Sequence, residues 1–167
     1  MNTYPNLCQA LALNKTPDDH LALWVGAQVA VQRLKMAQDV VFKQYGISAA
    51  QYNVLRILHG AGKSGLPCSA IAQRVIDKDP DMTRMLDRLE KMGLVLRWRD
   101  IKDRRSVRAA LSKAGHQRLD QLRTPISNLQ RQRLSSLSDQ DISTMAQTLD
   151  RLIGALEPGQ VAGESSK

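Results

Sequence analysis

The stretch MTRMLDRLEKMGLVLRWR, residues 82–99, decides the fold because its periodicity changes at Gly93. Before this glycine, the methionines and leucines recur at helical spacing and form one apolar face. Arg84, Arg88 and Lys91 fall on the opposite face of the same helix. After the glycine, apolar and basic residues alternate, as they do in a β-strand. The segment therefore predicts an amphipathic helix followed directly by a strand.

A charged turn and a second strand follow this segment. Residues 100–105, DIKDRR, predict the turn, and residues 106–111, SVRAAL, predict the returning strand of a β-hairpin. Residues 97–108 hold six Lys and Arg against two Asp, a local charge of +4. A narrow ribbon carrying arginine suits the minor groove of DNA, and a helix with a basic face suits the major groove. Either feature alone is more often a solvated surface, but here the two are adjacent.

Helical patterns flank this unit on both sides. The apolar spacing and the capping residues predict helices over 20–46, 48–60, 68–75, 112–134 and 139–156. The order predicts a mainly α fold with a small β-hairpin wing (α+β), a winged helix-turn-helix between long N- and C-terminal helices. The first helix is longer than a small domain packs against itself, which indicates a partner subunit.

The length of 167 residues fits one domain. We expect that domain over residues 20–156. Within it, residues 47–111 form the DNA-binding lobe, and the flanking helices serve dimerisation. The expected boundaries are a flexible N-terminal arm over 1–19, dimerisation helices over 20–46 and 112–156, and a disordered tail over 157–167.

The overall charge of +8 favours a polyanionic partner, either nucleic acid or an anionic membrane surface. No apolar run is long enough to span a membrane, so we expect no membrane partner. The N-terminus lacks the basic start of a signal peptide, and a cytoplasmic location is the natural expectation. Cys8 and Cys68 stand sixty residues apart outside any metal-binding spacing. We therefore expect neither a disulfide, nor a metal site, nor a cofactor.

Residues 46–115 resemble the core of the multiple antibiotic resistance regulator (MarR) family of bacterial transcription factors. The resemblance rests on GISAAQYNVLRIL, CSAIAQRVI, MTRMLDRLEKMGLVLRWRD and DRRSVRAALSKAG. It implies a homodimer with interdigitated terminal helices that binds a pseudo-palindromic operator in double-stranded DNA. Such proteins are usually repressors that small ligands or oxidants release. The reactive cysteine of the family's peroxide sensors aligns at or near Trp24, so we do not predict that kind of sensor.

The resemblance also implies roles for individual residues. Thr83, Arg84 and Arg88 match contacts of the recognition helix, and Arg105 matches the arginine of the wing that enters the minor groove. Asp103 matches the aspartate that braces the wing. Ser69 and Lys113 are candidate phosphate contacts. The predicted DNA-binding set is completed by Asp87, Lys91 and Arg104, which lie on the same helix and wing tip.

Family members that bind phenolic acids or drugs do so between the dimerisation helices and the winged lobe. Trp24, Gln28, Tyr52, Arg56 and His59 are the candidates for such a cleft in this chain. Two of them have simpler explanations. Trp24 suits a dimer core, and His59 lies near a helix end, where a cap or surface role is common. A small-molecule inducer therefore stays an open option.

Two other classes of function compete with DNA binding. An enzyme is not supported, because the three histidines share no ligand spacing and no phosphate loop or nucleophile elbow occurs. We predict no catalytic residues. The alternative is a winged helix that acts as a protein-interaction module without sequence-specific DNA binding. The basic charge on the helix and hairpin argues against it, because an interaction surface more often exposes apolar anchors.

Overall fold

The computed structural model describes residues 3–77, 81–101, 103 and 105–156. Two compact units divide the chain, Met1–Ser127 and Asn128–Lys167. This division differs from the single domain expected over 20–156. The break lies inside a helix, where no change in composition marks it.

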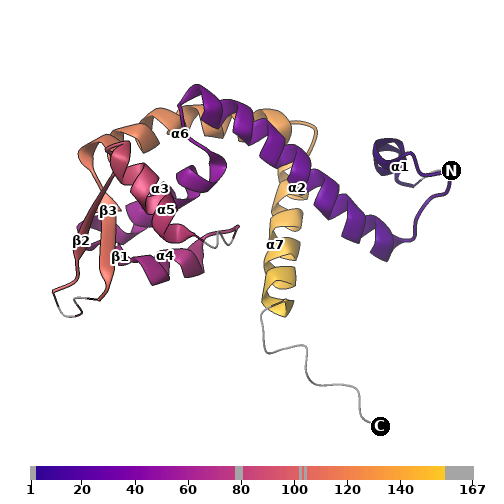
Figure 1. Ribbon diagram of the computed structural model, residues 1–167. Coiled ribbons are helices and arrows are strands. Elements are labelled where there is room, and N and C mark those ends of the chain that lie inside the picture. Colours follow the sequence, from indigo (N-terminus) through magenta and orange to yellow (C-terminus); the bar gives the residue numbers. More distant parts are fainter. Residues whose placement is uncertain (1–2, 78–80, 102, 104, 157–167) are drawn as a thin grey trace, which may run out of the picture. The chain divides into compact units, whose positions relative to one another are not determined.

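The first unit is mainly helical and carries one small sheet (Figure 1). The sheet has three antiparallel strands in the order β1-β3-β2. The predicted fold class, mainly α with a hairpin wing, is confirmed. In chain order the elements are α1 (Pro5–Leu11), α2 (Asp19–Gln44), α3 (Ala49–Ala61), the 3₁₀ turn η1 (Gly62–Ser64), β1 (Leu66–Pro67), α4 (Cys68–Arg74), α5 (Met82–Lys91), β2 (Val95–Arg99), β3 (Val107–Leu111) and α6 (Lys113–Arg133).

The short strand β1 was not predicted from the sequence. Two residues are too few to show a period of two, and β1 exists because β3 offers it a free edge. Leu66 pairs with Ala109, and Pro67 pairs with Arg108. Proline is tolerated here because β1 is an edge strand, where its missing N–H is not needed. The pairing brings the start of α4 beside the wing.

The core of the winged lobe is built from α3, α4, α5 and the sheet. The apolar face predicted for this helix is confirmed for Met82, Met85, Leu86 and Leu89, which are buried, whereas Met92, just after α5, is 40% exposed. Leu86 and Leu89 have no exposed surface, and neither do Leu55 of α3 and Ile71 of α4. Burying such side chains contributes about 1.5–3 kcal/mol each. Because this packing fixes which face of α5 is buried, it also fixes which face points outward.

The helix starts follow the expected capping chemistry. The side chain of Ser48 accepts a hydrogen bond from the Gln51 amide at the start of α3, and the Gln51 side chain returns one to the Ser48 amide. This capping box satisfies two backbone donors that the helix itself cannot. At the far end of α2, the Arg118 guanidinium donates to the Tyr45 carbonyl and so ties α6 to the end of α2.

The N-terminal arm is partly helical, in contrast to the flexible arm expected over 1–19. Cys8 of α1 is 6% exposed, and the side chain of Leu7 lies against Gly26 of α2. The Tyr4 hydroxyl donates a 2.6 Å hydrogen bond to Asp19, and this bond raises the pKa of Tyr4. These contacts join positions far apart in sequence, so local patterns could not reveal them.

The second unit holds the end of α6 and the helix α7 (Asp139–Ala155). Ser138 caps α7 in the predicted S-x-x-D arrangement, and its hydrogen bonds lower the pKa of Asp141. None of the residues of α7 is buried. Helix α6 continues through Pro125 to Arg133.

Two candidate features can be checked across the described residues. No helix among them combines the length and the apolar content needed to cross a bilayer. In the same ranges, no group of three or more His, Cys, Asp or Glu side chains is placed to hold a metal ion.

A glycine in the first turn of α6 makes the hairpin and the helix fit together. A Cβ at Gly115 would lie 2.1 Å from the Leu94 carbonyl oxygen. We predict that Gly115→Ala lowers the free energy of unfolding by about 1–3 kcal/mol, because the backbone must shift. Gly60→Ala in α3 is the control, since nothing lies within 4 Å of that site.

Gly60→Ala should raise the free energy of unfolding by about 0.5–1 kcal/mol through helix propensity alone. Urea denaturation followed by circular dichroism measures both variants. Equal effects at Gly60 and Gly115 would contradict the close approach of α6 to Leu94.

Candidate nucleic-acid interface

The outer face of α5 is basic and accessible. Thr83, Arg84, Arg88 and Lys91 are all exposed, as predicted for the side opposite the core. Asp81 caps the helix by accepting from the Arg84 amide at 2.9 Å. Its carboxylate also pairs with the Arg84 side chain, which is still 78% exposed.

One predicted contact on α5 has another partner within the protein. The Asp87 carboxylate forms an ion pair with Arg97 of β2. Glu90, one helical turn further along α5, lies 3.5 Å from the same guanidinium nitrogen. Asp87 therefore points toward the base of the wing and binds a protein cation. Asp87 was predicted to bind DNA only because it lies on the same face of the helix as the arginines.

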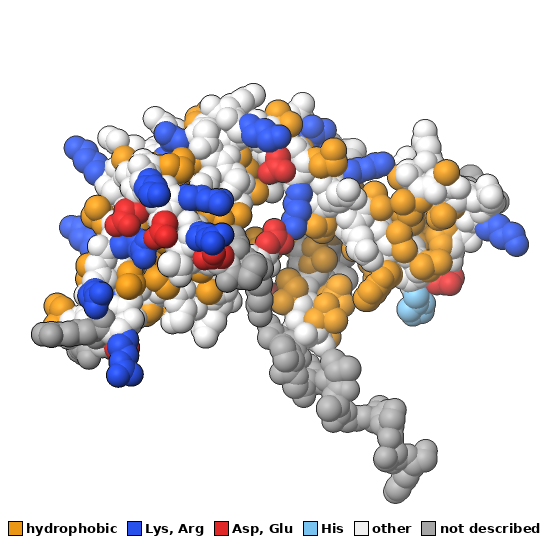
Figure 2. Space-filling view, viewed as in Figure 1, with side chains coloured by type: hydrophobic (Ala, Val, Ile, Leu, Met, Phe, Trp, Pro, Cys, Tyr) orange, Lys and Arg blue, Asp and Glu red, His pale blue; other side chains and the backbone are white. Residues whose placement is uncertain are grey.

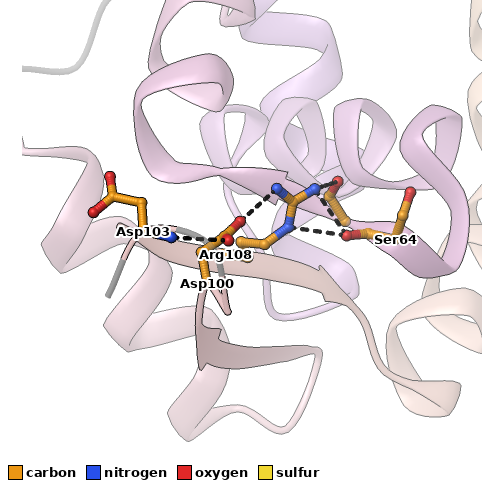
Figure 3. A network of polar contacts seen from close by, with 5 residues as sticks. Ser64, Asp100, Asp103 and Arg108 are labelled. Carbon is orange, nitrogen blue, oxygen red and sulfur yellow. Dashed lines mark hydrogen bonds and ion pairs between the residues drawn. The ribbon is translucent and has the colours of Figure 1, made fainter. Parts of the chain in front are cut away.

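The wing is held by a polar network around Arg108 (Figure 3). The Arg108 guanidinium pairs with Asp100 at 2.9 Å, and the two side chains are only 26% and 17% exposed. It also donates to the carbonyl oxygens of Ser64, at 3.1 and 3.2 Å, and Gly65, at 3.0 Å. The network thus joins β3 to the wing turn on one side and to the loop before β1 on the other.

Asp103, which we expected to brace the wing, acts within the turn. Its carboxylate accepts from the Arg105 amide at 3.0 Å, and its own amide donates to Asp100 at 3.3 Å. A second brace of the wing is the Asp100–Arg108 pair, which sequence reasoning missed. Arg108 counted only toward the charge of the hairpin, and nothing in its neighbourhood in sequence indicates a buried partner. Arg104 lies outside the described residues.

A cleft of about 310 Å³ lies between the start of α4, the start of α5 and the wing. It brings together three predicted contacts, Ser69, Thr83 and Arg105. Hydroxyl groups beside an arginine suit a phosphate oxygen. Cys68 also lines the cleft, and partial burial raises the pKa of its thiol, which keeps the thiolate scarce at neutral pH. Lys113 is exposed at the start of α6.

A second cavity, of about 280 Å³, lies between α2, α3 and the start of α5. Tyr52 lines it, with its ring 4.7 Å from that of Phe42. Lys35 and Asp77 also line it, and they form an ion pair at 2.9 Å. Met85 of α5 contributes to both this cavity and the lobe core.

The other predicted ligand contacts do not line this cavity. Trp24 is 70% exposed on α2, and the Gln28 amide donates to the Trp24 carbonyl at 3.3 Å. Arg56 donates to the Tyr52 hydroxyl at 3.4 Å. The His59 ring lies 5.5 Å from that of His116. Of the five predicted residues, the fold brings Tyr52 to the cavity and Arg56 next to Tyr52.

Known proteins with the same winged-helix fold are similar to this chain. The sequence profile of the MarR family matches residues 47–107. A solved MarR transcription factor from Planctomyces limnophilus has 31% identity and a TM-score of 0.64, over 84% of this chain and 98% of that one. The chain belongs to the MarR family. The members of this family are transcriptional regulators and not enzymes.

Two curated relatives are also similar. The uncharacterized HTH-type transcriptional regulator YkoM of Bacillus subtilis (strain 168) is 33% identical over 80 residues. That match covers 48% of this chain and spans about half, 51%, of YkoM. The homoprotocatechuate degradative operon repressor of Escherichia coli is 26% identical over 113 residues, 68% of this chain and 75% of the repressor.

The network around Arg108 makes a prediction about the stability of the wing. Asp100→Asn leaves the Arg108 charge without its partner in a half-buried position, and we expect a loss of about 1–3 kcal/mol in unfolding free energy. Hydrogen exchange of the Ser106 amide, which donates to the Asp103 carbonyl, should accelerate because the turn opens locally.

Asp120→Asn is the control for this experiment. Its ion pair with Arg123 joins side chains that are 69% and 76% exposed, so its removal should change stability by no more than about 0.5 kcal/mol. Unchanged exchange at Ser106 in Asp100→Asn would show that the network does not hold the wing.

Proposed function

We propose that this MarR-family regulator is a homodimeric repressor that binds a pseudo-palindromic operator in double-stranded DNA. The observation that carries the proposal is the placement of three elements around one cleft. The basic face of α5, the start of α4 and the wing with Arg105 meet there. These elements suit the two grooves of a duplex and the sugar-phosphate strand between them.

The recognition helix α5 enters the major groove. Arg84 and Arg88 are long, exposed and on its outer face, and arginine reads guanine through two hydrogen bonds to O6 and N7. Thr83 and Lys91, at the two ends of the same face, contact the backbone phosphates on either side. Burial of Leu86 and Leu89 beneath them holds the helix at a defined angle.

The wing enters the adjacent minor groove through Arg105. When two elements of one lobe occupy neighbouring grooves, the phosphodiester strand that separates the grooves passes between them. In this protein that strand crosses the cleft lined by Ser69, Thr83 and Ser106. Their hydroxyl groups donate to phosphate oxygens, and Lys113 contacts the backbone nearby.

Dimerisation is supported by the apolar side chains that each unit leaves exposed. Figure 2 shows hydrophobic side chains gathered over the N-terminal helices, apart from the Lys and Arg side chains of the winged lobe. Exposed apolar surface of this extent is typical of a subunit interface. The exposed residues are Leu21, Leu23, Trp24, Val31, Leu34, Met36 and Val40 of α2, and Met145, Leu149, Leu152, Ile153 and Leu156 in or next to α7.

A small ligand that releases the DNA would occupy the 280 Å³ cavity beside Tyr52. Met82 and Met85 line that cavity and belong to the apolar face that supports α5. An occupant would therefore press directly on the helix that reads the DNA. The name of the Escherichia coli relative, an operon repressor, supports repression as the sign of regulation.

The test is selection of binding sites from fragments of the source genome. Purified protein is mixed with intergenic fragments and with random duplex at physiological salt. We expect one or a few fragments to be preferred by about 10³-fold or more. Uniform binding that collapses with salt would indicate a non-specific basic protein. The absence of DNA binding would favour the alternative, a winged helix that acts as a protein-interaction module.

Substitutions of a base-reading residue and of a phosphate-contacting residue should differ in how far the loss of affinity depends on the DNA sequence. Arg88→Ala should weaken binding to the selected operator by about 1–3 kcal/mol and relax the base preference at one position. Lys113→Ala should weaken operator and random duplex alike, and should reduce the salt slope by about one. Fluorescence anisotropy at several salt concentrations measures both. If Arg88→Ala lowers the affinity for operator and for random duplex equally, Arg88 does not read bases.

The dimer gives a prediction that is independent of DNA. We expect sedimentation at micromolar concentration to show a species of twice the mass of one chain. Leu149→Glu combined with Leu152→Glu should dissociate it, because each substitution places a charge in apolar surface. Gln147→Glu, a charge at a polar position of α7, is the control and should leave the dimer intact. A stable monomer of the unmodified chain would contradict the proposal.

A further inference from the structure

Arg97 is a basic residue of the wing that lines the cleft beside Thr83, yet its guanidinium is paired with carboxylates of the protein. Its side chain is 15% exposed, and its Nη1 contacts the carboxylates of both Asp87 and Glu90. Within the described part of the chain, its buried Nε has no hydrogen-bond partner. The charge is therefore directed into the protein, between strand β2 and helix α5.

The position of Arg97 matters because α5 and β2 are joined only by a short turn. Gly93 in this turn has a φ of +71°, and its amide donates to the Glu90 carbonyl at 2.8 Å. The Arg108 network holds the wing turn to Ser64 and Gly65, which belong to the region before β1. The ion pairs of Arg97 reach α5 itself, the element that carries Arg84 and Arg88.

We propose that Arg97 is a positioning residue that sets the angle between the wing and the recognition helix. Two charge-assisted contacts one helical turn apart on α5 resist both rotation and sliding of β2. Arg105 at the wing tip and Arg88 on α5 then reach neighbouring grooves at the same time. The inference rests on the proposed operator binding, and it makes the wing contact conditional on ion pairs within the protein.

The experiment measures how much Arg105 contributes to operator affinity, first in the unmodified protein and then in a variant of Arg97. In the unmodified protein, Arg105→Ala should lower operator affinity by about tenfold, as expected for one groove-reading arginine. In an Arg97→Met background, the same substitution should cost only about twofold, because the wing no longer reaches the groove reliably. Hydroxyl-radical protection of the flanking minor groove should be lost, while protection of guanine N7 in the major groove from dimethyl sulfate persists.

Two further variants separate the loss of wing positioning from the simple loss of a positive charge. Arg99→Met removes the same charge from the same strand, and Arg99 is exposed and forms no ion pair among the described residues. It should weaken both duplexes alike and leave the Arg105→Ala effect near tenfold. Arg97→Lys keeps a cation within reach of Asp87 and should restore part of the Arg105→Ala effect.

The outcomes distinguish this inference from the proposed function. If Arg97→Met folds, binds the operator and keeps the full Arg105→Ala effect, the positioning role is wrong although the function stands. If Arg97→Met does not fold, Asp87→Asn with Glu90→Gln removes the same contacts from partly exposed positions, and the same comparison decides. If the unmodified protein prefers no fragment, the function and the inference fall together.

Discussion

The burial of one face of α5 is the constraint on which the interface depends. Leu86 and Leu89 have no exposed surface, and Met82 and Met85 are nearly as deep. A helix fixed on one side can offer only the other side to a partner, so Arg84, Arg88 and Lys91 point outward together. The sheet supports this arrangement because Gly115 lets the start of α6 approach Leu94 closely. The outward charges of α5 are thus a consequence of the packing beneath them.

The arginines of the hairpin that the structure describes divide into two kinds, although they look alike in sequence. Arg97 and Arg108 are turned into the protein, where each meets at least one carboxylate. Arg99 and Arg105 are exposed. The inward pair gives the wing its shape and its attachment, and the exposed pair gives it charge. Some arginines of a basic hairpin therefore form ion pairs within the protein. A count of Lys and Arg overestimates the positive charge that a ligand can contact.

The cavity beside Tyr52 and the cleft beside Thr83 lie against the same short helix. Met82 and Met85 line the first, and Thr83 lines the second. Successive residues at the start of α5 therefore face the cavity proposed for a small molecule and the cleft proposed for a phosphate. A close-packed helix moves as a body, so a change at one of these sites reaches the other without a long pathway.

The sequence by itself determined the order of the main elements, the apolar face of α5, the helix N-caps at Ser48 and Ser138, and the likeness to the MarR family. These features repeat within a few residues, and local spacing is sufficient to read them. Only the tertiary structure decided that α1 packs on α2, that β1 completes the sheet, that Asp100 pairs with Arg108, and that Asp87 binds Arg97. Each of these depends on residues distant in sequence, or on which side of a strand or helix meets the core. Charge and periodicity along the chain contain no information about such partners, because only packing chooses them.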